Sequence, residues 1–254
     1  MLKMIAMDLD GTLLTKDKNI SAYALEILSK CRGQGVMLVV ATARSEIAAT
    51  KYVEILKPDA TIFNCGSVAK GEKGIIFEEQ IPVDICRDLI NVCTEKYNLK
   101  NTKIVTRFGD FSNAPNISGD DFEYIFDDYN NLMEGAYKIT IKADLPVAQQ
   151  VAEHFESCSM IRFEGRNSFM FTHVNATKEI AIQKVASHFG VNMNEIVAFG
   201  DDLTDIKILH ACEIGVAVSN ALPEVKEVAN FICGSNNDDG VANWIDSHMD
   251  LFSE

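Results

Sequence analysis

The chain has 254 residues, of which 47% are hydrophobic and 24% are charged, and this composition is ordinary for a globular protein of one large or two modest domains. Its net charge of −14 argues against a nucleic acid or an anionic membrane as the main partner. A small anionic substrate stays compatible with that charge, because a local group of basic side chains, a metal ion and backbone N–H groups can override the overall field.

The cysteines and the N-terminus predict where the protein works. The seven cysteines are an odd number and show no C-x-x-C spacing, so we expect buried free thiols in a reducing compartment instead of disulfides or a zinc site. The first apolar run ends at Asp8, which is too short for a signal peptide or a membrane span, and no later run is long enough. We therefore expect a cytoplasmic protein.

Apolar runs typical of buried strands occur near both ends of the chain, separated by helical patterns. The clearest helix is Ser21–Arg32, with Ser21 as its N-cap and glycines at 33 and 35 after it. Continuous apolar strands between helices predict a parallel sheet covered on both faces. The expected strands are Met4–Met7, Val36–Ala41, Thr61–Phe63, Ile196–Phe199, Ile214–Val218 and Asn230–Cys233.

The middle of the chain, from Pro82 to Val174, has a different pattern: helix, two strands, helix, strand, helix, two strands. The acidic stretch Asp120–Asp128 is interpreted as an amphipathic helix within it. We therefore predict an α/β fold with a doubly wound parallel-sheet core (residues 1–81 and 173–254) and an inserted α+β domain (residues 82–172). The surest strands of the insert are Tyr137–Lys142, Met160–Glu164 and Phe169–His173.

Three polar segments each follow an apolar strand directly. They are D-L-D-G-T at 8–12, T-A-R at 42–44 and G-D-D-L-T-D at 200–205. In an open α/β sheet, ligands bind at the carboxyl ends of the strands. If the three strands are neighbours, five side chains meet at one edge of the sheet: Asp8, Asp10, Thr42, Asp201 and Asp205.

Such a group of side chains favours phosphoryl transfer. Clustered carboxylates repel one another, so a cation is expected among them, and oxygen ligands suit Mg²⁺. A metal-bound carboxylate can attack phosphorus, and a second carboxylate two residues further on can protonate the leaving oxygen and then activate water. Thr42 offers a hydroxyl and a backbone N–H to phosphoryl oxygens, and a lysine could complete the charge around them.

The three segments, together with Lys178, resemble the motifs of the haloacid dehalogenase (HAD) superfamily. Further matches are A-T-A-R at 41–44, N-C-G-S at 64–67, G-V-A-V-S-N-A at 215–221 and D-D-G-V-A at 238–242. Taken in order along the chain, they resemble the Cof-type, IIB branch of sugar- and cofactor-phosphate phosphatases. The resemblance covers both segments of the predicted core.

This resemblance implies a Mg²⁺-dependent phosphatase that hydrolyses a small-molecule phosphate monoester through an aspartyl phosphate on Asp8. Asp10 is then the general acid/base. The implied metal ligands are Asp8, Asp10, Asp201 and Asp205, with Asp205 supporting the metal or its waters. The implied phosphate-binding residues are Leu9, Thr42, Ala43 and Lys178, and the implied substrate contacts are Arg44 and Thr204.

Two positions depart from the family pattern. Ala43 stands where glycine is usual, so this turn must avoid a positive φ or carry strain. Thr204 stands where asparagine is usual, which keeps a hydroxyl and loses an amide.

Two other functions stay open as alternatives, namely a phosphomutase of the phosphomannomutase type and a non-catalytic phosphometabolite-binding protein. The presence of both Asp8 and Asp10 argues against a mere binder, which needs neither a nucleophile nor a proton shuttle. Substrate identity and oligomeric state are not predicted. Specificity is expected in the loops Gly109–Gly119 and Glu164–Ser168 of the insert.

Overall fold

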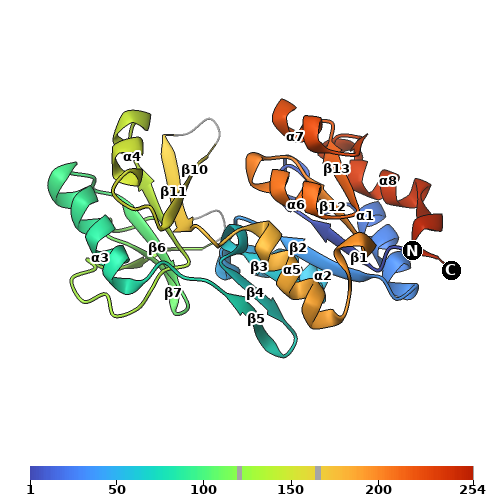
Figure 1. Ribbon diagram of the computed structural model, residues 1–254, viewed down its shortest axis with the longest axis horizontal. Helices are drawn as coiled ribbons and strands as arrows, with labels where there is room; N and C mark the ends of the chain where they lie inside the picture. The colour runs from blue at the N-terminus through green and yellow to red at the C-terminus, as the bar shows by residue number, and fades with distance from the viewer. Residues whose placement is uncertain (119–121, 164–166, 254) are drawn as a thin grey trace. The chain divides into compact units, whose positions relative to one another are not determined.

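The computed structural model of the protein describes residues 1–118, 122–163 and 167–253, and it divides into two compact units (Figure 1). The first unit contains Met1–Ala43, Tyr52–Phe77 and Thr177–Glu254. The second contains Arg44–Lys51 and Glu78–Ala176. Besides shifts of a few residues at the boundaries, this division differs from the expected one because Arg44–Lys51 clusters with the second unit.

The first unit is built on a sheet whose eight strands, among the described residues, have the order β14-β13-β12-β1-β2-β3-β4-β5. The pairs from β14 to β3 are parallel, whereas β4 runs antiparallel to β3, so the parallel pattern expected up to residue 81 is wrong at this edge. The bounds are β1 Met4–Met7, β2 Met37–Ala41, β3 Ala60–Phe63, β4 Val68–Gly71, β5 Gly74–Glu78, β12 Ile196–Gly200, β13 Ile214–Val218 and β14 Phe231–Cys233.

Helices cover both faces of this sheet. From the central pair of strands, the chain moves outward in one direction through β1, α1 and β2 and in the opposite direction through β12, α6 and β13. Right-handed crossovers therefore place α1 and α6 on opposite faces. α1 packs against α8, while α6 packs against α5 and α7. The bounds are α1 Ala22–Gly33, α2 Glu46–Leu56, α5 Lys178–Phe189, α6 Ile206–Ala211, α7 Pro223–Val228 and α8 Gly240–Ser247.

Short helical turns join these elements: η1 Asn64–Gly66, η3 Met193–Glu195, η4 Leu203–Asp205, η5 Asn236–Asp238 and η6 Met249–Phe252. Ser21 caps α1 as predicted, because its hydroxyl accepts a hydrogen bond from the backbone N–H of Ala24. All four residues of β1 are buried, as expected for a strand covered on both faces. The predicted doubly wound α/β class is confirmed.

The second unit has its own sheet, with the strand order β10-β11-β9-β6-β7-β8 in the described residues. Its buried core includes Leu89 and Cys93 from the helical side and Ile104, Ile139 and Phe171 from the sheet. The helices are α3 Val83–Asn91, the π-helical turn η2 Val92–Lys96 and α4 Leu145–Ala152. The strands are β6 Thr102–Thr106, β7 Gly109–Ser112, β8 Ile125–Phe126, β9 Lys138–Lys142, β10 Cys158–Arg162 and β11 Ser168–His173.

The helix predicted at Asp120–Asp128 is wrong for residues 122–128, where Ile125–Phe126 forms β8 and pairs with β7. The aromatic residues at 122, 124 and 126 recur with period two, which is typical of a strand and not of a helix. Residues 120 and 121 of this stretch lie outside the described residues. Residue 119 of the expected specificity loop Gly109–Gly119 and residues 164–166 of the expected loop Glu164–Ser168 also lie outside the described residues. Residue 164 is, in addition, the predicted last residue of the strand Met160–Glu164.

All seven cysteines are free and buried, as predicted. Over the described ranges, none of the helices combines the length and apolar character that a membrane span requires.

Candidate active site

The centre of the first unit's sheet contains the point where the strand order reverses. β1 and β12 lie side by side, and the chain proceeds from them toward opposite edges of the sheet. Ligands of doubly wound sheets bind at such a point, outside the carboxyl ends of the strands. Asp8 is the first residue after β1 and Asp201 the first after β12, so the topology brings both to this place.

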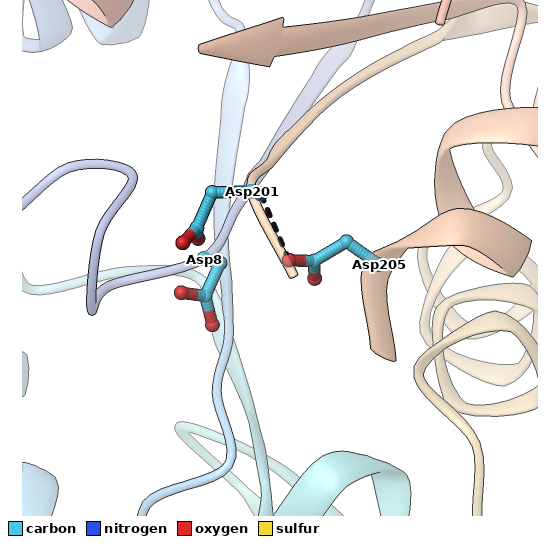
Figure 2. A group of neighbouring side chains, drawn as sticks. All are labelled: Asp8, Asp201 and Asp205. Carbon is cyan, nitrogen blue, oxygen red and sulfur yellow. Dashed lines mark hydrogen bonds between the residues drawn. The ribbon is translucent and has the colours of Figure 1, made fainter. Parts of the chain in front are cut away.

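Three carboxylates converge there with one lysine. Asp8, Asp201 and Asp205 each offer an oxygen atom, and these atoms lie within 4.8 Å of one another (Figure 2). Lys178 Nζ donates to Asp8 Oδ1 at 2.7 Å and to Asp205 Oδ1 at 2.6 Å. Lys178 is the first residue of α5 and is only 2% exposed, so a buried ammonium joins two buried carboxylates.

The negative charges in this cluster outnumber the positive one. Burial raises the pKa of Asp8 well above its ordinary value, Lys178 opposes this rise, and the neighbouring carboxylates add to it. Burial also raises the pKa of Asp201 to about 7, against the hydrogen bond from Thr12. Burial lowers the pKa of Lys178, but Asp205 and Asp8 together raise it above its ordinary value.

A divalent cation fits this set of oxygen donors, because its charge would offset both the burial and the mutual repulsion that raise the pKa values of Asp8 and Asp201. The three carboxylates are not equivalent for that purpose. Asp205 Oδ2 accepts from the backbone N–H groups of Asp201 and Asp202, each at 3.1 Å, and its Oδ1 accepts from Lys178. With three donors on its two oxygens, Asp205 orients the loop after β12, which leaves Asp8 and Asp201 as the more accessible ligands.

In the turn after β1, several backbone N–H groups donate to the same carbonyl group. Leu9 O accepts from the backbone N–H groups of residues 12, 13 and 14. Gly11 has φ +83°, and a Cβ at this position would lie 2.2 Å from Asp201 Oδ2, so only glycine fits. The hydroxyl of Thr12 donates to Asp201 Oδ1 at 2.6 Å, and Asp10 Oδ1 lies 2.5 Å from Lys18 Nζ. The turn after β1 therefore contacts the loop after β12 directly.

Thr42 and Ala43 lie at the end of β2, beside β1. Thr42 is 1% exposed; its N–H donates to Ile62 O at 2.8 Å and its carbonyl accepts from Cys65 N at 3.0 Å. Ala43 is not among the residues with positive φ, so the turn avoids the strain that replacing glycine could cause. The buried Thr42 is thus tied to the N-C-G-S segment that follows β3.

A family model described as haloacid dehalogenase-like hydrolase matches residues 5–245, which is nearly the whole chain. The protein belongs to the haloacid dehalogenase-like hydrolases. This membership confirms the family predicted from the motifs, and the protein is a phosphatase of that family.

Named relatives and solved structures of this family span almost the full length of the chain. It is 24% identical to 5-amino-6-(5-phospho-D-ribitylamino)uracil phosphatase of Bacillus subtilis, with 98% of both chains covered. It is 26% identical to pyridoxal phosphate phosphatase of Escherichia coli, with 97% of this chain and 98% of the relative covered. A HAD phosphatase structure from Bacteroides thetaiotaomicron matches with a TM-score of 0.86 at 22% identity, covering 99% and 96% of the two chains. A Thermotoga maritima protein matches with a TM-score of 0.86 at 21% identity, covering 97% of both. At these identities the solved structures show the fold.

The two predicted substrate contacts of this HAD-like hydrolase, Arg44 and Thr204, belong to different compact units. Arg44 clusters with the second unit, and its Nη1 donates to Ala48 O at 3.1 Å along the first turn of α2. Thr204 is half-buried within η4, in the loop that Asp205 organises. A substrate role for these two residues stays a prediction.

Four residues that hold the Asp8–Leu14 turn of this HAD-like hydrolase were not predicted as site residues, although three of them stand in or beside the motifs named above: Thr12 contacts Asp201, Lys18 contacts Asp10, and Asn220 and Asn236 donate to backbone carbonyls of the turn. Thr12 belongs to D-L-D-G-T, Asn220 belongs to G-V-A-V-S-N-A, and Asn236 stands two residues before D-D-G-V-A. Lys18 lies outside all of the motifs named above. The motifs marked these positions, but only the contacts reveal what the side chains do.

Proposed function

We propose that this protein hydrolyses the phosphate monoester of a small metabolite through an aspartyl phosphate on Asp8. The observation that carries the proposal is the buried ammonium of Lys178 between Asp8 and Asp205, with Asp201 alongside. The lysine holds the nucleophile in one orientation before substrate arrives, so little reorganisation is needed during the reaction. A protein that only binds phosphometabolites has no need of this arrangement.

The reaction has two displacements. A carboxylate oxygen of Asp8 attacks phosphorus, and the bond to the ester oxygen breaks while Asp10 gives that oxygen a proton. Asp10 then takes a proton from a water molecule that attacks the aspartyl phosphate. Inorganic phosphate leaves, and Asp8 and Asp10 return to their starting states.

We propose Mg²⁺ as the cofactor, held by Asp8, Asp201 and the backbone carbonyl of Asp10, with Asp205 supporting the site. When bound, the ion supplies charge neutralisation and polarises the phosphoryl group. The chain's own phosphate contacts are then Lys178, Thr42 and the backbone N–H groups of Leu9 and Ala43. Both the raised pKa of Asp8 and that of Asp201 support a cation at this place.

Residues 82–172, within the second unit, are proposed as the inserted domain that selects the substrate, with Arg44 and Thr204 as further contacts. Its separate sheet and core support this division of labour. Relatives named for 5-amino-6-(5-phospho-D-ribitylamino)uracil and for pyridoxal phosphate suggest a sugar-alcohol phosphate or a cofactor phosphate as substrate. The seven buried free thiols support a cytoplasmic location.

Assaying the purified protein against a panel of phosphate esters that includes these two compounds tests the proposal. We expect release of inorganic phosphate that a chelator abolishes and added Mg²⁺ restores. Asp8→Asn serves as the control for contaminating phosphatases. Full activity in excess chelator would contradict the metal assignment, and an isomerised phosphosugar in place of free phosphate would favour the phosphomutase alternative.

A further inference from the structure

Two asparagine side chains hold carbonyl groups of the turn that carries Asp10. Asn220 Nδ2 donates to Gly11 O at 2.7 Å, and Asn236 Nδ2 donates to Leu14 O at 2.7 Å. The two asparagines are themselves connected, because the backbone N–H of Asn236 donates to Asn220 Oδ1 at 2.9 Å. We call Asn220 and Asn236 the asparagine pair.

The two members of the asparagine pair belong to two loops at the carboxyl ends of the strands, the same side of the sheet where the carboxylates lie. Asn220 follows β13 and Asn236 begins η5 after β14, and both strands run parallel to β12. In the loop of Asn220, the backbone N–H of Leu222 also donates to Asp201 O at 3.0 Å. This loop therefore contacts both the turn of Asp10 and the loop of Asp201.

One of the held carbonyls belongs to a glycine. Gly11 has φ +83°, and glycine has more accessible backbone conformations than any other residue, so the hydrogen bond from Asn220 adds to the one between Thr12 N–H and Leu9 O in fixing the peptide group that follows Gly11. Gly11 directly follows Asp10, so the hydrogen bond to the Gly11 carbonyl restrains the backbone one residue beyond Asp10. Asn236 is 8% exposed, and a buried amide in such a place is stable only when hydrogen-bonded.

We propose that Asn220 and Asn236 are positioning residues that hold Asp10 in line with the oxygen it protonates. The assignment rests on the proposed function, in which Asp10 is the general acid/base. General acid–base catalysis contributes roughly 10²–10⁴-fold to rate, and a loosened turn loses part of that factor. The loss falls on proton transfer and spares the phosphate contacts of Lys178 and Thr42.

The test compares phenyl phosphate with 4-nitrophenyl phosphate, which are similar in size but release phenols of different acidity. The readout is the ratio of kcat/KM for the nitrophenyl ester to kcat/KM for the phenyl ester, because kcat/KM covers the steps up to departure of the phenol. Asn220→Ala and Asn236→Ala should each raise this ratio roughly tenfold over the wild type, since protonation matters more for the poorer leaving group. Asn220→Asp keeps the acceptor for Asn236 and loses the donor to Gly11, so it should raise the ratio as well.

Asn230→Ala is the matched control. Asn230 Oδ1 accepts a hydrogen bond from Gly215 N at 2.7 Å near the start of β13. The Asn230→Ala variant therefore loses a comparable hydrogen bond, but at the amino ends of the strands, away from the carboxylates. It should lower the melting temperature without moving the ratio. If the buried Asn236→Ala variant fails to fold, the exposed Asn220 variants carry the test alone.

The possible outcomes separate the two proposals. An unchanged ratio in active, folded Asn220→Ala and Asn220→Asp overturns the positioning role while leaving the proposed function standing. A ratio that rises equally in Asn230→Ala overturns it too, because the effect would then be general loosening. No phosphate release by the wild type from any ester of the panel overturns the proposed function, and the positioning role with it.

Discussion

At the scale of residues, Lys178 donates to Asp8 and Asp205 while Asp201 lies beside these two carboxylates, so this cluster holds three carboxylates and one ammonium. Asp8 and Asp201 both have raised pKa values, chiefly because they are buried. Lys178 already opposes both rises, and a bound cation would favour the charged carboxylates further.

The raised pKa of Asp201 predicts a pH-dependent stabilisation by Mg²⁺. Its pKa is about 7 in the folded protein against an ordinary 3.8, so the stability contributed by the protonated form is lost as pH rises between these values. Mg²⁺ binds the deprotonated form, and the rise in melting temperature on adding Mg²⁺ should therefore be larger at about pH 8 than at about pH 6. Thermal unfolding with and without Mg²⁺ measures this. In Asp201→Asn, the Mg²⁺-induced rise in melting temperature should differ less between about pH 8 and about pH 6 than in the wild type. If this difference is unchanged, another group is responsible for the pH dependence.

The two aspartates of the turn should respond differently to amidation. Asp8→Asn should give almost no turnover and no covalent intermediate, because an amide is not a nucleophile toward phosphorus. Asp10→Asn should lose roughly 10²–10⁴-fold with poor leaving groups and less with an activated aryl phosphate. Rapid-quench labelling with a phosphorus-labelled ester measures the intermediate. Labelling of a residue other than Asp8, or near-normal turnover by Asp8→Asn, would refute the mechanism.

At the scale of elements, the start of α5 depends on a close contact with η1. A lysine in the first turn of a helix is unfavourably placed against the helix dipole, so Lys178 must be held there by its carboxylates and by the packing of the turn. Thr177 caps the helix by accepting from Ile180 N. Gly66, in the N-C-G-S segment, lies so close to Thr177 that a Cβ there would be 2.2 Å from its carbonyl carbon.

Gly66→Ala should therefore displace the start of α5, move Lys178 and lower kcat together with the melting temperature. Gly74→Ala is a matched control, because Gly74 has a similar φ of +115° against +113° at Gly66, but open space around its Cβ position. Backbone strain alone costs on the order of 1–3 kcal/mol in both variants. Circular dichroism melts and steady-state rates should separate them, with lost activity only at position 66. Equal activity in the two variants would mean that α5 tolerates the displacement.

At the scale of the whole molecule, one chain forms two units with separate cores. The first carries the carboxylate cluster, and the second contains an independent sheet with its own buried residues. The chain enters and leaves the second unit between β5 and α5, apart from Arg44–Lys51 at the start of α2. Under the proposed function, such a division would allow substrate selection to change without altering the carboxylate cluster.

Exchanging residues 109–118 of the second unit for those of a relative should reorder the ranking of phosphate esters while leaving the Mg²⁺ concentration for half-maximal activity unchanged. An exchange of residues 72–73, between β4 and β5 of the first unit, should alter neither property and is the control. Initial rates over the ester panel at several Mg²⁺ concentrations measure both. An unchanged ranking would show that other residues select the substrate.

Local patterns by themselves determined much of this protein. The apolar runs located the buried strands, Ser21 located a helix start, and the polar segments after three strands identified the candidate catalytic residues. Each of these signals depends on neighbours within a few residues, so it can be seen along the chain. The family and the fold class followed from them.

Only the tertiary structure decided which distant groups meet. Lys178 and Asp8 are 170 residues apart, and Asn236 and Leu14 are 222 apart, so their contacts depend on the order of strands in the sheet. Within the stretch 122–128, the period-two spacing of the aromatic residues is compatible with a strand, but only the pairing of Ile125–Phe126 with β7 decided against the helix predicted there. Composition and periodicity describe a segment's own preferences, but hydrogen-bond partners supplied by other segments determine the outcome where those preferences are weak.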